Sequence, residues 1–345
     1  MSERRGTYFE KWAEAEGIPV VRGYSMENLY QLPLKWWERK GGFGALIILE
    51  GGEGWTSAYV CEIPPKTSLK PQRHYFEEQI YVLTGRAETK VWAEGVPEQT
   101  FSWQEYSLFS PPLNAWHQHR NPGDEPARYV AVTNAPVMFN LLGSADLIFN
   151  ANIMSRDRLS GWSRGFFDGV GNVVGDEWRG GLMLDVRKPE LPESVMGERF
   201  GLRFLRLSSN IMVGHIGELA VGHYKKIHRH AGGAHIIIPN GEGYSLIWKE
   251  ESEKIRVDWK KGSIFSPPEG WFHVHFNTCG EPVRQVALRY GGLGTGKIYK
   301  PGLDMKHGGD QVEYEDEPPE IRKIYEQELS KKGLQMKMSP VARKV

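Results

Sequence analysis

Three histidines in the second half of the sequence, His228, His230 and His273, have the residue type and spacing of a metal site. Residues two apart on a β-strand point to the same side, so we expect His228 and His230 to face one interior. A histidine from a facing strand can then complete a triangle. Three neutral imidazoles on one side of a divalent cation leave the remaining positions open to water, substrate or oxygen. The spacing therefore predicts a site that performs chemistry.

An internal repeat gives these histidines counterparts in the first half of the chain. The segment SLFSPPLNAWHQHRNPGDEPARYVA (107–131) resembles SIFSPPEGWFHVHFNTCGEPVRQVA (263–287), which lies 156 residues later. The same offset aligns His74 with His230 and Gly85 with Gly241. A repeat of this length predicts two homologous domains. We place domain 1 near residues 45–150 and domain 2 near 200–300.

The aligned ligand positions of domain 1 hold a different set of residues, which are Gln72, His74, Glu78 and His117. Two histidines and a carboxylate can hold a divalent metal, and Gln72 could add a weak oxygen donor. Three glycines of domain 2 are replaced at the equivalent positions, by Lys66, Tyr106 and Asn114. Domain 1 therefore keeps two interpretations, a second metal site or a vestigial site.

Short β-like runs separated by turn residues surround these motifs. We expect strands at 79–83 and 87–92, and a hairpin in which 235–238 leads through Pro239-Asn240-Gly241 into 244–248. Many short strands predict an all-β barrel or jelly roll, which protects sheet edges.

The segments outside the two domains are an N-terminal arm (1–44), a connector (151–199) and a C-terminal tail (301–345). We expect a short helix around 7–16, stopped by Gly17, and a longer helix over 320–332, opened by Pro318-Pro319 and stopped by Gly333. The connector is rich in Gly, Asp and Arg, and we expect it to cover the mouth of one barrel.

Composition narrows the partners and the compartment. Lysine plus arginine and aspartate plus glutamate both total 43, so no net field favours nucleic acid or an anionic membrane. Two cysteines and a charged start without an apolar core fit a reducing compartment, and no apolar run reaches the roughly 18 residues of a membrane span. We therefore expect a cytoplasmic protein with a small-molecule substrate.

Two segments carry a specific resemblance. The pattern Gly222-x5-His228-x-His230, followed by Gly262-x5-Pro268-x-Gly270-x2-His273-x3-Asn277, is similar to the two signature motifs of the cupin family. With the repeat, the chain resembles a bicupin. The resemblance implies an all-β protein with two tandem cupin jelly-roll barrels and a helical C-terminal tail, a divalent metal in the barrel, and a homo-oligomer.

One departure from the cupin pattern narrows the reaction that the resemblance implies. Ala234 stands where cupins usually place a glutamate ligand. This looks like the ring-cleaving cupin dioxygenases that act on gentisate, salicylate and hydroxynaphthoate, although their working site usually lies in the first barrel. Three neutral ligands also leave the full charge of the ion to bind an anionic substrate. The resemblance thus implies an Fe(II) dioxygenase that acts on a chelating hydroxy-acid or an aromatic molecule.

Two alternatives stay open. A lyase, isomerase or decarboxylase could use Zn, Mn or Ni as a Lewis acid, and bicupin oxalate decarboxylases are the comparison, although they carry three histidines and a glutamate in both barrels. A non-catalytic binding protein, as among seed-storage cupins, is the other.

Two further residues are candidates for catalysis in domain 2. His275 lies two residues beyond His273 and should share its interior face, as His119 should in domain 1. An arginine could hold a substrate carboxylate bidentately, and we choose Arg284 among Arg203, Arg206, Arg284 and Arg289. The alternation of side chains alone leaves open which arginine faces inward, and each residue could simply be a packed or surface side chain.

Overall fold

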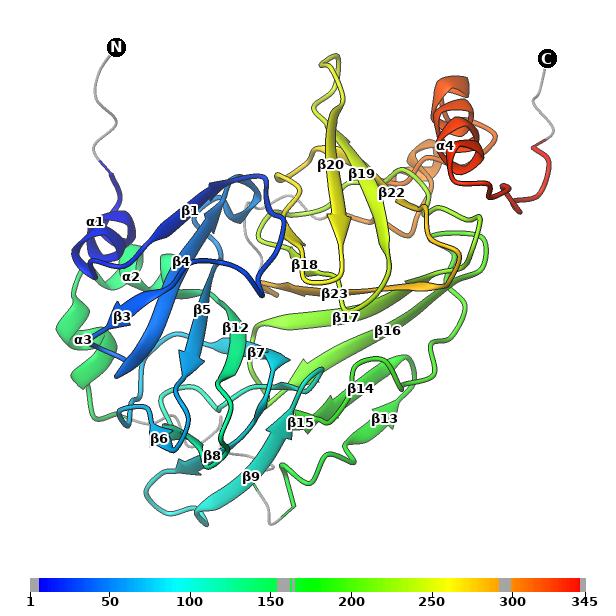
Figure 1. Ribbon diagram of the computed structural model, residues 1–345. Helices are drawn as coiled ribbons and strands as arrows, with labels where there is room; N and C mark the ends of the chain where they lie inside the picture. The colour runs from blue at the N-terminus through cyan, green and yellow to red at the C-terminus, as the bar shows by residue number, and fades with distance from the viewer. Residues whose placement is uncertain (1–5, 154–161, 163–164, 292–298, 342–345) are drawn as a thin grey trace.

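The structure is a computed structural model that describes residues 6–153, 162, 165–291 and 299–341 (Figure 1). Residues 1–5 of the predicted arm, 154–161 and 163–164 of the predicted connector, and 342–345 of the predicted tail lie outside the described residues. Strands dominate the chain, and short helices lie at its periphery. The predicted all-β class is confirmed.

Barrel 1 is formed by two sheets from the first half of the chain. The larger has the order β1-β4-β5-β12-β7-β10-β15, with β3 beside β4, and the smaller has the order β6-β11-β8-β9. The strands are β1 (Val20–Gly23), β3 (Lys35–Trp37), β4 (Gly42–Leu49), β5 (Ser57–Ile63), β6 (Thr67–Ser68), β7 (Glu78–Thr84), β8 (Arg86–Trp92), β9 (Gln99–Gln104), β10 (Leu108–Phe109), β11 (Trp116–Asn121), β12 (Ala127–Thr133) and β15 (Leu182–Met183).

Barrel 2 repeats this plan in the second half. One sheet has the order β13-β14-β16-β17-β23-β18-β21-β2, and the other has the order β20-β19-β22. The strands are β2 (Ser25–Met26), β13 (Asn172–Val174), β14 (Glu177–Gly180), β16 (Phe200–Leu207), β17 (Val213–Leu219), β18 (His235–Ile237), β19 (Glu242–Trp248), β20 (Ile255–Lys260), β21 (Ile264–Phe265), β22 (Phe272–Asn277) and β23 (Val283–Arg289).

Both predicted helices are confirmed. Helix α1 (Tyr8–Ala15) begins after Thr7, which forms a capping box with Glu10. Helix α4 (Pro319–Lys331) packs its apolar side against barrel 2. The sequence did not lead us to expect two further helices, α2 (Ala135–Leu142) and α3 (Ala145–Asn150), which pack with α1 around Phe139. The described residues also contain two 3-10 turns, η1 (Glu50–Gly52) and η3 (Met305–His307). No helix in the described part of the chain combines the length and apolarity of a membrane span.

The predicted hairpin around Gly241 is wrong. Strand β18 pairs with β21 and β23, whereas β19 pairs with β20 and β22 in the other sheet. The turn crosses between sheets because it packs against β23: the Asn240 side chain accepts from Arg284 N (3.2 Å) and donates to Pro282 O (2.8 Å). A Cβ on Gly241, which has φ of +75°, would lie 2.4 Å from Val283. The sequence correctly predicted a turn at this point. Which strands pair on either side of the turn depends on contacts between residues that are distant in sequence.

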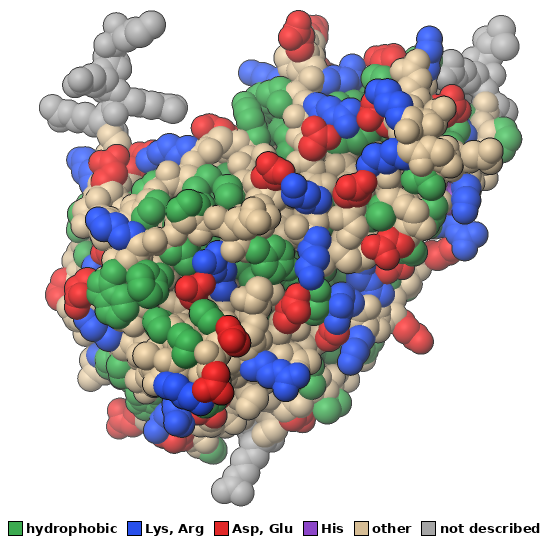
Figure 2. Space-filling view, viewed as in Figure 1, with side chains coloured by type: hydrophobic (Ala, Val, Ile, Leu, Met, Phe, Trp, Pro, Cys, Tyr) green, Lys and Arg blue, Asp and Glu red, His purple; other side chains and the backbone are tan. Residues whose placement is uncertain are grey.

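The two barrels exchange strands and share one core. Strand β2, from the predicted N-terminal arm, pairs with β21 of barrel 2, and β15, from the predicted connector, pairs with β10 of barrel 1. Between the barrels, side chains from both halves form a single apolar cluster that includes Val60, Val130, Leu205 and Val286. On the outer surface, acidic and basic side chains alternate over the face in view (Figure 2), as the equal totals suggest.

Candidate metal centres

The three predicted ligands of barrel 2 lie together. His228 pairs with His273 across an isolated bridge, with His228 N donating to His273 O (3.1 Å) and the reverse bond at 2.9 Å. The imidazole centroids lie 4.2 Å apart for this pair and 4.6 Å apart for His230 and His273. One ring nitrogen of each histidine lies within 4.8 Å of the other two. The strand register thus brings three imidazoles to one point.

The hydrogen bonds of these histidines select the tautomer that a metal requires. Each Nδ1 contacts a backbone carbonyl, that of Lys226 for His228 (2.9 Å), Ala231 for His230 (2.7 Å) and Trp271 for His273 (3.0 Å). A carbonyl only accepts, so each Nδ1 carries the proton and each Nε2 presents a lone pair. The buried Nε2 of His273 has no hydrogen-bond partner among the described residues. This donor set fits a divalent cation.

Burial keeps the same imidazoles neutral. It lowers the pKa of His230 to about 3, and it lowers the pKa values of His228 and His273 well below 6.5. The positive charge of Lys225 lowers all three further. Neutral imidazoles can bind a metal without first losing a proton.

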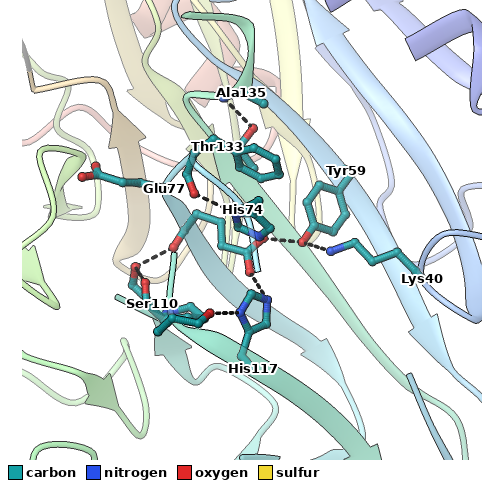
Figure 3. Close-up of polar contacts among 12 residues, drawn as sticks. Lys40, Tyr59, His74, Glu77, Ser110, His117, Thr133 and Ala135 are labelled. Atoms are coloured by element: carbon teal, nitrogen blue, oxygen red, sulfur yellow. Dashed lines mark hydrogen bonds and ion pairs between the residues drawn. The ribbon is translucent and has the colours of Figure 1, made fainter. Parts of the chain in front are cut away.

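Barrel 1 brings together His74, Glu78 and His117, as its half of the repeat predicts (Figure 3). Glu78 Oε1 lies 3.2 Å from His117 Nε2, and Glu78 Oε2 lies 3.6 Å from His74 Nε2. Both imidazoles direct Nδ1 to a carbonyl, that of Phe76 for His74 (2.7 Å) and that of Ala115 for His117 (3.2 Å). Their Nε2 lone pairs therefore face carboxylate oxygens, and the cluster requires a cation, either a metal ion or a proton.

A buried lysine compensates Glu78 from the other side. Lys40 Nζ donates to Tyr59 Oη (2.8 Å), and Tyr59 Oη donates to Glu78 Oε2 (2.5 Å) (Figure 3). Burial alone would raise the pKa of Glu78, but Lys40 and the histidines outweigh it and hold this pKa well below 4.5. Lys40, Tyr59 and Gln72 line a cavity of about 20 Å³, which has room for about one water. Lys40 therefore supplies a buried counter-charge for Glu78 in addition to the two histidines.

His275 lies beside the ligands in a different tautomer. Its ring centroid is 5.3 Å from that of His273, and its Nδ1 lies 2.7 Å from Ser245 Oγ. Trp259 Nε1 donates to the same hydroxyl (2.9 Å), and the described residues give the Ser245 hydroxyl proton no other acceptor than His275 Nδ1, which favours the tautomer with the imidazole proton on Nε2. Barrel 1 contains the same arrangement in Trp103, Thr89 and His119. His275 is thus built to donate a hydrogen bond and not to bind a metal.

Arg284, our candidate for holding substrate, does not join the histidines. Its guanidinium pairs with Glu218 (2.7 Å) and donates to the carbonyls of Val186 and Pro189 (3.0 Å each). These bonds hold the connector against the outside of barrel 2. Arg284 points outward because residues 284 and 287 are an odd number of positions apart on β23, so its side chain lies on the face opposite Ala287. Arg203 and Arg206 are likewise engaged outside, with Glu190 O and with Glu177.

The residues that sequence reasoning missed are Lys40, Tyr59, His215 and Lys225. Tyr59 and His215 are 156 residues apart and face the two barrel interiors from β5 and β17. Extending the repeat beyond its motifs would have identified this pair. Lys40 has no such signal, because it reaches barrel 1 from the turn between β3 and β4.

Comparisons with known proteins agree with this architecture. A family model described as cupin domain matches residues 59–133. No curated protein matches the sequence. Among solved structures, oxalate decarboxylase from Bacillus subtilis at pH 4.6 has a TM-score of 0.52 at 13% identity, covering 78% of this chain and 76% of that one. A mutant of the Bacillus subtilis enzyme covers 94% and 90%, with a TM-score of 0.52 at 12% identity.

Vicilin from Corylus avellana (hazelnut) has a TM-score of 0.51 at 12% identity, covering 78% of this chain and 85% of that one. Oxalate decarboxylase, which its name describes as an enzyme, and vicilin therefore both resemble this chain in fold. At these identities the likeness establishes the fold alone.

Proposed function

We propose that this two-domain cupin protein is a divalent-metal enzyme that acts on a small anionic molecule without oxygen, by lyase or decarboxylase chemistry, with barrel 2 as its working site. The observation that carries the proposal is the convergence of three neutral imidazoles, His228, His230 and His273, whose Nδ1 protons are all bound to carbonyls. When bound there, Zn, Mn, Ni or Fe(II) supplies a Lewis acid that polarises substrate oxygens.

The residues around this point have separable roles. The three histidines hold the ion, and because none is charged, they leave its full positive charge to attract an anion. His275 offers its Nε2 proton to a substrate oxygen, since Ser245 and Trp259 fix its tautomer. Barrel 1, balanced by Lys40 and with room for about one water beside Tyr59, serves as the structural partner.

A second candidate is the Fe(II) dioxygenase that the resemblance implies. Ala234 favours it, because the position holds no carboxylate ligand. Three open coordination positions would admit both a chelating substrate and oxygen. We place it second because the fold neighbours named above include oxalate decarboxylase, whose name describes a reaction that removes a carboxyl group.

Turnover under argon separates the two functions. Protein loaded in turn with Mn, Zn, Ni and Fe(II) should convert a member of a panel of small dicarboxylates and hydroxy-acids with oxygen excluded, since Lewis-acid chemistry needs none. Product analysis under argon and an oxygen electrode in air measure the two reactions on the same samples. His273→Ala is the control, and oxygen uptake with salicylates, gentisates or catechols, without turnover under argon, would establish the dioxygenase instead.

Restoring the missing carboxylate should suppress oxygen chemistry. In the Ala234→Glu protein we expect metal to be retained and any oxygen uptake to fall at least about tenfold, because the carboxylate fills an open position and lowers the effective charge of the ion. Barrel 1 supports this geometry, since the equivalent Glu78 lies 3.2 Å and 3.6 Å from two imidazole nitrogens. Elemental analysis and steady-state rates measure the effect, and Ala234→Gln is the uncharged control. Oxygen uptake in Ala234→Glu as fast as in the parent would remove the argument from neutral ligands.

A further inference from the structure

Lys225 is a buried lysine in barrel 2 whose ammonium group has no counter-ion among the described residues. Its side chain is only 4% exposed, and its backbone N donates to His275 O (3.1 Å) on the strand that carries the ligands. Its Nζ lies 5.1 Å from the centroid of the Phe200 ring. Within the described residues the ammonium makes no hydrogen bond and no ion pair. Burial, followed by the charge of Arg289, lowers the pKa of Lys225 to about 7.

Arg289 is a second cation of the same interior. It ends β23 opposite Val213 and extends from the same face as Ala287, which opposes His215. Burial lowers its pKa, and its charge adds to burial in lowering the pKa values of His230 and Lys225. The described residues provide no ion pair for its guanidinium, which remains partly accessible to solvent. The guanidinium of Arg289 is therefore close enough to His230 to lower its pKa, and it still reaches solvent.

The internal repeat shows that these cations belong to barrel 2 alone. The positions 156 residues earlier are Leu69 in place of Lys225 and Thr133 in place of Arg289. In barrel 1 the carboxylate of Glu78 is balanced by Lys40, whereas barrel 2 has Ala234 in place of that carboxylate and two cations, Lys225 and Arg289. Buried charge without a partner is costly, so such an arrangement persists only with a compensating gain.

We propose that Lys225 and Arg289 form the anion-binding half of the barrel 2 site, and that its ligand is a small organic dianion with one acidic group toward the three histidines and the other held by the two cations. This inference rests on the proposed function for the role of the histidines. A dicarboxylate, or a carboxylate with a second acidic oxygen, has the required chemistry. Arg289 can hold a carboxylate with two parallel bonds, and Lys225 adds a point charge behind it.

The first test requires no ligand. In anion-free buffer, Lys225→Leu, which installs the residue of barrel 1, should raise Tm by at least about 3 °C, because it removes an uncompensated buried charge. The matched control is Lys226→Leu, whose ammonium pairs with Glu313 (2.5 Å), and it should not raise Tm. Thermal denaturation by circular dichroism measures both. An unchanged or lower Tm in Lys225→Leu would overturn the proposal.

The second test measures anion binding. Oxalate, malonate and succinate are titrated into metal-loaded protein by calorimetry, with malonamide as the uncharged control. At least one dianion should bind the parent, and Lys225→Leu and Arg289→Thr should each bind it at least about tenfold more weakly. Lys226→Leu should match the parent. Failure of every dianion to bind, or equal binding by Lys225→Leu, would overturn the proposal.

The two proposals can fail separately. Metal content, measured on the same samples, reports on the three histidines and is expected to stay unchanged in Lys225→Leu and Arg289→Thr. A parent that holds no metal, yet binds a dianion in a manner that depends on Lys225, would refute the proposed metal enzyme and leave the anion site standing.

Discussion

Protein carrying His228→Ala is expected to bind its metal at least about 100-fold more weakly than the parent, and to lose turnover with it. Loss of groups that merely orient a ligand costs 10- to 100-fold, and His228 would be a ligand itself. The Nε2 atoms of His230 and His273 alone cannot replace it, since the barrel 2 cluster contains no carboxylate among the described residues. Elemental analysis after dialysis, and competition with a coloured chelator, measure the change.

Two control proteins make this result specific. His74→Ala should keep most of the metal, because Glu78 of barrel 1 is already compensated by Lys40 through Tyr59. His307→Ala alters an exposed histidine, with a side chain 74% exposed, and should match the parent. If His74→Ala loses the metal and His228→Ala keeps it, barrel 1 is the principal site and our assignment is wrong.

The other large effect concerns stability. In metal-free protein, Lys40→Met should lower the free energy of unfolding by about 3–5 kcal/mol, because it leaves the Glu78 carboxylate buried without its lysine. Urea denaturation followed by circular dichroism measures it. The matched control is Lys70→Met, which breaks an exposed ion pair with Glu38 and should cost under about 1 kcal/mol. Equal, small effects of both substitutions would show that Glu78 does not depend on Lys40.

The sequence predicted the centre of the site better than its surroundings. His228, His230 and His273 come together because strand geometry makes the orientation of residues two apart a local property, and the repeat supplies the facing strand. His275 lies beside them for the same reason. The same alternation could not choose among four arginines, because the registers of β16 and β23 depend on their partner strands β14, β17 and β18. Arg284 therefore proved to face outward.

The charged residues inside the barrels also could not be predicted from local sequence patterns. Lys40 reaches Tyr59 from the turn before β4, and no pattern in its neighbourhood marks it as buried. Lys225 could have been recognised as a difference between the two halves, because the repeat places Leu69 at its equivalent position. Comparing the two halves position by position would have shown where barrel 2 gained positive charge. The prediction of a hairpin at Gly241 was wrong for another reason: a turn signal does not specify which sheet the next strand joins.

The exchange of strands between barrels has a consequence for synthesis on the ribosome. Strand β2 ends at Met26, but its partner β21 begins at Ile264 and is therefore translated more than 200 residues later. At 5–20 residues per second, the edge of β2 waits for roughly 10–50 s after it emerges. Parallel pairing of β1 with β4 anchors the arm nearby during this interval. The arm can thus reach its final place only after β21 has been made.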